Sequence, residues 1–174
     1  MSHRWLLEQG FAAKKIGWAG ISAGATIVTQ LAYRCQKQKL PLAATAAVMS
    51  GLLDFEFRGQ SFQYNAERDI VVPDRLKNIA HYYLPETVSR GDTELCPARQ
   101  TYLTYPQTLF QVGDHEVLLD DSVSFFEAMR QQGHDVALQV VPGLLHVGQL
   151  FCRDFSPRQA AIDQAAAYLR VNLS

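Results

Sequence analysis

A Gly-x-Ser-x-Gly motif, Gly20-Ile21-Ser22-Ala23-Gly24, stands between a short apolar run and a stretch with helical periodicity. The run from Ile16 to Ala19 predicts a buried strand, and apolar residues recur after it at helical spacing, at Ile27, Val28, Leu31 and Cys35. Glycines around the serine leave room for a sharp strand-to-helix turn that holds the hydroxyl clear of the backbone. An ordinary Gly-Ser loop before a helix explains this five-residue motif equally well. The rest of the chain is needed to distinguish the two interpretations.

Apolar stretches of strand length alternate with helical patterns along most of the sequence. The pattern predicts strands over residues 16–19, 43–49, 108–112 and 136–141, and helices from residue 23 and over 73–84, 119–132 and 156–171. In the helix over 119–132 the apolar face is expected to hold Val123, Phe126 and Met129. Such alternation is typical of an α/β protein with a mostly parallel sheet that helices cover on both faces.

The length of 174 residues fits one domain with a sizeable core, so we expect residues 1–174 to form a single α/β domain. Between residues 51 and 105 the periodicity loosens, which indicates a partly irregular insertion near the site. Its aromatic side chains could line a pocket for the substrate or form an ordinary satellite core, and the candidates for the pocket are Phe55, Phe57, Phe62 and Tyr64.

Composition excludes several classes of partner and location. With 48% hydrophobic and 19% charged residues the chain resembles a globular protein, and a net charge of −1 argues against a nucleic-acid partner. No apolar stretch approaches the 18 residues of a membrane span. Cys35, Cys96 and Cys152 lie far apart, which favours reduced thiols and a cytoplasmic protein. No histidine or cysteine pair has metal-ligand spacing, so we expect neither metal nor cofactor.

A serine hydroxyl becomes a good nucleophile only when a base takes its proton, and an acid must orient that base. His146 follows the strand over 136–141 and a Pro142-Gly143 turn, so it is expected at the same sheet edge as Ser22. The other histidines are weaker candidates. They lie at the terminus, on the insertion, beside the acidic loop or at the opposite edge: His3, His81, His115 and His134.

The acid is expected in the loop after the strand over 108–112, where four carboxylates compete. Asp120 and Asp121 fall in the first turn of the next helix, where carboxylates are commonly structural. Asp114 and Glu116 lie in the loop proper, and position alone does not separate them.

Five ordered blocks resemble bacterial esterases of the hormone-sensitive-lipase type over nearly the whole chain. The blocks are residues 5–10, 20–24, 65–69, 111–122 and 142–146. The resemblance implies an α/β-hydrolase fold and hydrolysis of short acyl esters by a Ser–Asp/Glu–His triad. It assigns Ser22 as nucleophile, His146 as base and Glu116 as acid, and it implies that the Ala23 N–H is an oxyanion donor. The chain order serine, acid, histidine is the one this fold uses.

The chain departs from that family in one respect. Family members carry a His-Gly-Gly oxyanion loop and further strands before the serine, whereas no histidine here is followed by glycine. We therefore expect an N-terminally truncated, C-terminal portion whose first strand is an exposed edge open to self-association. Two alternatives to the ester hydrolase stay open. One is a catalytically weak or inactive fragment that needs its missing half, and the other is a lactonase or another acyl hydrolase with the same triad.

Overall fold

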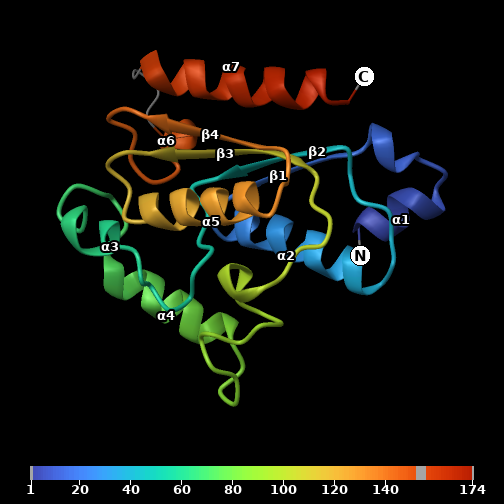
Figure 1. Ribbon diagram of the computed structural model, residues 1–174. Helices are drawn as coiled ribbons and strands as arrows, with labels where there is room; N and C mark the ends of the chain where they lie inside the picture. Colours follow the sequence, from blue (N-terminus) through green and yellow to red (C-terminus); the bar gives the residue numbers. More distant parts are fainter. Residues whose placement is uncertain (1, 152–155, 174) are drawn as a thin grey trace.

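The computed structural model describes residues 2–151 and 156–173, and its centre is a four-stranded sheet (Figure 1). The strands are β1 (Gly17–Ile21), β2 (Thr45–Met49), β3 (Gln107–Gly113) and β4 (Val136–Val141). They lie in the order β1-β2-β3-β4, and every neighbouring pair is parallel. Because a parallel pair needs a crossover connection, each link between strands carries helical structure. The predicted α/β class and its four strands are confirmed, with bounds shifted by two residues or fewer.

Helices cover both faces of this sheet. In Figure 1, α2 (Ala23–Lys37) and α5 (Leu119–Gln131) lie on one face, and α7 (Ser156–Val171) lies on the other. The shorter α1 (Ser2–Glu8) and η1 (Ala13–Lys15) precede β1, and α6 (Gly148–Phe151) follows β4. The two central strands are accordingly buried along almost their whole length, as the apolar run over 43–49 predicted.

The main core lies between the sheet and the layer of α2 and α5, and it differs from the sequence prediction in detail. Ile27 was expected on the buried face of α2 but is 60% exposed. The helix packs through the predicted Val28 and Cys35 and through Ala25 and Ala32, whose small side chains allow a close approach to the sheet, and Tyr33 is buried in the same cluster. In α5, Phe125 and Met129 are buried, whereas Val123 and Phe126 are only partly buried. The helical period was right and the predicted Val28, Cys35 and Met129 are buried, but the buried faces also include neighbouring positions, Ala25, Ala32 and Phe125.

The segment 51–105 contains α3 (Ser61–Tyr64), α4 (Pro73–Tyr83) and η2 (Pro97–Arg99). Proline begins α4 because its missing N–H costs nothing in the first turn. The segment builds a second core cluster of buried side chains, Leu52, Phe55, Phe62, Leu76, Ala80, Leu84, Cys96, Val117 and Leu118. The last two residues come from the loop after β3, so this cluster packs directly against the loop in which the acid was expected.

Two further predictions concern membrane-spanning helices and the cysteines. None of the helices in residues 2–151 and 156–173 is long and apolar enough to cross a membrane. Cys35 and Cys96 are buried free thiols, and Cys152 lies outside the described residues.

Candidate active site

Ser22 lies at the sharp turn between β1 and α2, in a strained backbone conformation. Its φ of 55° and ψ of −121° are unusual for a residue with a side chain. The Ser22 N–H donates to the Met49 carbonyl at 2.9 Å, which extends the pairing of β1 with β2, and its own carbonyl accepts from the Ala25 N–H at 2.9 Å. A Cβ at position 20 would overlap the Gly24 backbone, whereas one at Gly24 would meet nothing within 4 Å. The close approach therefore requires glycine only at position 20.

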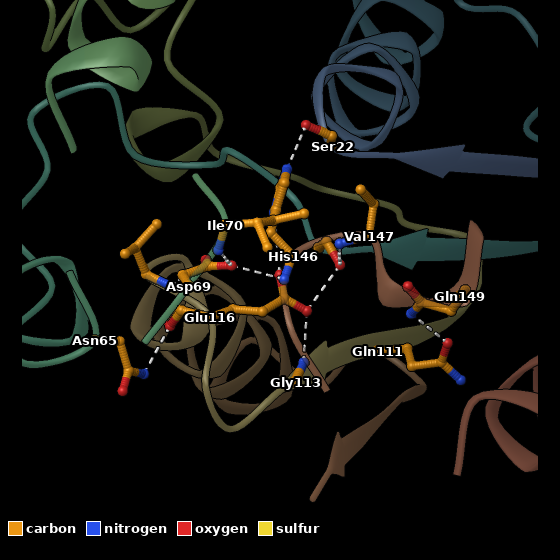
Figure 2. Close-up of polar contacts among 12 residues, drawn as sticks. Ser22, Asn65, Asp69, Ile70, Gln111, Gly113, Glu116, His146, Val147 and Gln149 are labelled. Atoms are coloured by element: carbon orange, nitrogen blue, oxygen red, sulfur yellow. Dashed lines mark hydrogen bonds and ion pairs between the residues drawn. The ribbon is translucent and has the colours of Figure 1, made fainter. Parts of the chain in front are cut away.

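His146 connects Ser22 to Glu116 across the carboxyl edge of the sheet, as Figure 2 shows. Its Nε2 lies 2.9 Å from the Ser22 Oγ, and its Nδ1 lies 3.2 Å from the Glu116 Oε2. The three residues come from the loops after β1, β3 and β4. An ionised carboxylate only accepts hydrogen bonds, so Nδ1 carries the imidazole proton and Nε2 is free to accept the serine proton. His146 is 4% exposed and Glu116 is fully buried.

The Glu116 carboxylate is fixed by two further donors. Its Oε1 accepts from the Ser50 Oγ at 2.9 Å and from the Gly113 N–H at 2.6 Å, which leaves Oε2 for the imidazole. Burial raises the pKa of Glu116 above its ordinary value, while the hydrogen bonds from His146, Gly113 and Ser50 act in the opposite direction. Ser50 itself is buried and has a φ of 49°. Its role was missed in the sequence, since a lone serine after a strand carries no pattern.

The other three acidic candidates have different partners. Asp114 accepts from the Gly143 N–H at 2.6 Å and so anchors the turn before His146. Asp120 accepts from the backbone N–H of Ser61 at 2.9 Å. Asp121 accepts from the backbone N–H groups of Leu53 and Asp54, each at 3.0 Å. Among the described residues, Glu116 is the carboxylate that contacts the His146 ring, and the structural use expected of Asp120 and Asp121 matches these contacts.

Two of the other histidines, His3 and His134, contact groups other than Ser22. His3 is buried, where its Nε2 lies 2.8 Å from the Pro41 carbonyl oxygen and its Nδ1 accepts from the Trp18 indole. The His134 Nε2 lies 2.9 Å from the Tyr102 carbonyl oxygen. The described part of the chain holds no group of three or more His, Cys, Asp or Glu that could bind a metal ion.

The four aromatic residues predicted for the substrate pocket lie in or beside the second core cluster. Phe55 and Phe62 are buried within it, and the ring of Phe57 packs on Phe62 with centroids 4.6 Å apart. Tyr64 is 52% exposed, and its hydroxyl lies 3.5 Å from the Asp120 Oδ1. These contacts give the aromatic residues a packing role, and their contact with substrate stays a prediction.

Ala23, the predicted oxyanion donor, follows Ser22 directly. It is exposed and is the first residue of α2. The first N–H groups of a helix have no partner within the helix, and the helix dipole favours negative charge beside them. The Ala23 N–H is therefore available to an anion formed next to the Ser22 Oγ.

Comparison with known proteins agrees with this architecture. A family described as alpha/beta hydrolase fold matches residues 1–150. The chain belongs to this family. This α/β hydrolase is also 31% identical over 170 residues to an acetyl-hydrolase of Streptomyces hygroscopicus and 29% identical over 164 residues to an esterase of Acinetobacter venetianus. The matches cover 97% and 94% of this chain, but only 56% and 54% of those relatives.

Solved structures give the same picture of this α/β hydrolase. A crystal structure of an esterase from the bacterial hormone-sensitive lipase (HSL) family matches with a TM-score of 0.93 and 30% identity, covering 99% of this chain and 58% of that one. A crystal structure of EstE5 soaked with p-nitrophenyl butyrate matches with a TM-score of 0.91 and 28% identity, over 98% and 57% of the two chains. The chain is thus homologous to HSL-family esterases and spans a little over half of their length.

Proposed function

We propose that this chain carries the catalytic triad of a carboxylic-ester hydrolase that acts on short acyl esters. Ser22 is the nucleophile, His146 the general base and acid, and Glu116 the residue that orients the imidazole. The observation that carries the proposal is the unbroken contact from the Ser22 Oγ through His146 to Glu116, at 2.9 and 3.2 Å. The esterase relatives and the soaking of EstE5 with p-nitrophenyl butyrate support the substrate class.

The mechanism follows from the positions of these groups. As the Ser22 Oγ attacks the ester carbonyl carbon, the His146 Nε2 takes the hydroxyl proton, and Glu116 stabilises the imidazolium. The imidazolium then protonates the leaving alkoxide, so the alcohol departs and the acyl group stays on Oγ. Water attacks the acyl carbon, gives its proton to His146 and releases the carboxylic acid, while Ser22 regains its proton. The Ala23 N–H donates to the oxyanion in both halves of the reaction.

Covalent labelling tests the nucleophile without requiring turnover. We expect a fluorophosphonate probe to modify Ser22 in the full chain, because the probe reacts with a serine that a base has activated. Ser22→Ala should abolish labelling, and Ser124→Ala, at an exposed position of α5, should leave it unchanged. Mass spectrometry of the labelled peptide identifies the site. Labelling that persists in Ser22→Ala would reject the assignment.

A second proposal concerns partners and follows from the edge of the sheet. In the sheet formed by the described residues, β1 pairs with β2 alone, so its other edge is open. An open strand edge presents free N–H and C=O groups that favour pairing with another chain. We therefore propose that the chain self-associates through the open edge of β1.

The Ala23 oxyanion donor gives an expectation for activity, and the open edge of β1 gives one for oligomeric state. With the Ala23 N–H as the donor, we expect hydrolysis of p-nitrophenyl acetate and butyrate well below the ~10 s⁻¹ of an ordinary enzyme. Ala19→Lys places a charge on the exposed side of β1 and should reduce association in light scattering. A chain that stays monomeric in light scattering would refute self-association through β1, and turnover of ~10 s⁻¹ would refute the expected weak activity.

Localisation is also part of the proposal. The buried free thiols of Cys35 and Cys96 are in keeping with a reducing compartment, and we propose the cytoplasm.

A further inference from the structure

Asp69, in the segment 51–105, binds the backbone of both loops that carry the triad partners of Ser22. Its Oδ1 accepts from the His146 N–H at 2.8 Å, and its Oδ2 accepts from the Val117 N–H at 2.8 Å. Figure 2 shows the carboxylate beside the backbone of His146. Asp69 is 77 residues from His146 and 48 from Val117 in the chain. One carboxylate therefore ties together two loops that lie far from it in the sequence.

The segment around Asp69 is itself fixed to the acid loop. The side chain of Asn65 is buried, and its Nδ2 donates to the carbonyls of Asp114 and Glu116, each at 2.9 Å. The Asn65 carbonyl in turn accepts from the Arg68 and Asp69 N–H groups at 2.9 and 3.0 Å. These contacts form a compact turn that packs on the acid loop, and Asp69 extends from this turn to the histidine loop. The position of the Asp69 carboxylate is thus set by the loop that holds the acid.

The histidine loop needs such an external contact because its backbone is strained. Val147 has a φ of 50°, a conformation that a β-branched residue rarely adopts. Strained backbone persists where surrounding contacts over-determine it. The Val147 N–H lies 3.4 Å from the Ser50 Oγ, a long contact, whereas the bond from the His146 N–H to Asp69 is short and has a carboxylate acceptor. Hydrogen bonds to an ionised acceptor are roughly twice as strong as neutral ones.

We propose that Asp69 is a positioning residue, which sets the His146 imidazole relative to Glu116 and Ser22 by joining the backbones of the two loops. This inference rests on the proposed triad, and Asp69 acts through backbone groups without contacting the reacting atoms. Its loss would let the 3.2 Å contact between His146 and Glu116 lengthen, and a misplacement of about 1 Å can cost about 100-fold in rate.

The test compares Asp69→Asn with Asp74→Asn, a matched change at an exposed residue of α4 whose side chain is 89% accessible. The Asp69 Oδ1 also accepts from the Ile70 N–H at 2.7 Å. In Asp69→Asn, the amide NH₂ faces either the Val117 N–H or the His146 and Ile70 N–H groups, so the tie to one of the two loops is broken. We expect the second-order rate of fluorophosphonate labelling at Ser22 to fall about 10- to 100-fold, with Asp74→Asn at the wild-type rate. With p-nitrophenyl acetate, kcat should fall while KM changes little, which a general loss of folded protein does not produce.

Two measurements on the unchanged chain keep the inference testable if Asp69→Asn does not fold. In hydrogen exchange, the amides of His146 and Val117 should be protected well beyond those of an exposed loop. In proton NMR, the His146 Nδ1 proton should give a downfield signal. If Asp69→Asn were labelled at the wild-type rate, or if the His146 and Val117 amides of the wild type were unprotected, the proposed role of Asp69 would be overturned. A wild-type chain that takes no label would instead reject the proposed triad, and amide protection would still decide whether Asp69 joins the loops.

Discussion

The sheet with its covering helices and the segment 51–105 contribute to the site in different ways. The sheet brings Ser22, Glu116 and His146 to one edge, each in a loop at the carboxyl end of a strand. The segment contributes none of these three groups. It provides apolar packing beneath the acid loop and polar contacts to the loop backbones. The reacting groups come from the regular part of the fold, and their support comes from the irregular part.

This division predicts two kinds of functional loss. A change at the sheet edge removes a chemical group and leaves the fold intact. A change in the segment leaves the chemistry in place but loosens it, because Val117 and Leu118 pack in the same cluster as Phe55 and Phe62. The two regions are therefore distinguished by measuring labelling or turnover and stability on the same variant.

The largest effect is expected for Glu116→Gln at the sheet edge. The amide cannot orient and stabilise the imidazole as a carboxylate does, so kcat should fall on the order of 10⁴-fold. The amide can still accept from the Gly113 N–H, and we expect little change in unfolding. Steady-state hydrolysis of p-nitrophenyl butyrate and a urea titration measure the two quantities.

Two neighbouring acids serve as controls for Glu116. Asp120→Asn and Asp114→Asn should reduce activity far less, since their carboxylates bind the backbone of Ser61 and Gly143. If Asp114→Asn proved more damaging than Glu116→Gln, the acid would be misassigned by two residues. Asp114 would then be the residue that orients the imidazole, and Glu116 would be one that supports the loop.

A stability effect is expected for Phe55→Ala in the segment. Phe55 is 1% exposed, and truncation of a buried phenylalanine costs about 3–5 kcal/mol. Tyr64→Phe is the contrasting change, because the tyrosine is half exposed and its 3.5 Å contact with Asp120 is weak, so stability should change by less than about 0.5 kcal/mol. Urea unfolding measures both. If Tyr64→Phe instead changed KM for butyrate relative to acetate, the segment would line the substrate pocket as well as support the loops.

The same contrast explains what the sequence could predict. The strands and long helices of the sheet region have clear periods, and β4 and α7 were predicted with their observed bounds. The buried face of α2 was misjudged at Ile27, because a period sets spacing while close packing against the sheet chooses the smaller alanines. Which residues of a helix are buried therefore depends on tertiary contacts, and the sequence pattern does not contain these contacts.

The site shows a similar limit. Ser22 and His146 could be placed because each follows a predicted strand. Asp114 and Glu116 could not be separated by position, since two residues in one loop differ only in where the folded loop directs them. Asp69 had no period or spacing to mark it, although it lies in a block that carried the family resemblance. Contacts between distant loops determine these residues, and local sequence does not encode them.

The last expected effect is a pH dependence of stability and concerns Asp121, which joins the two regions. It lies in the first turn of α5, and it accepts from the backbone of Leu53 and Asp54 where the segment begins. Burial raises its pKa to about 7, against about 3.9 in an unfolded chain. Between these values the unfolded chain loses the proton while the folded chain keeps it. The contribution of Asp121 to stability is therefore full below pH 4 and declines as the pH rises to 7, by at most about 4 kcal/mol.

Asp121→Asn removes this titration, and its amide oxygen can still accept from Leu53 and Asp54. Urea unfolding of both proteins from pH 4 to 8 gives the difference in unfolding free energy between wild type and variant, in which the raised pKa of Glu116 cancels. As the pH rises, the unfolding free energy of the wild type should fall relative to that of Asp121→Asn. The difference should level off above pH 7. Asp74→Asn, at an exposed site, should show no such trend. A difference independent of pH would mean that Asp121 is ionised throughout and that the junction between the regions is held by an ordinary charged carboxylate.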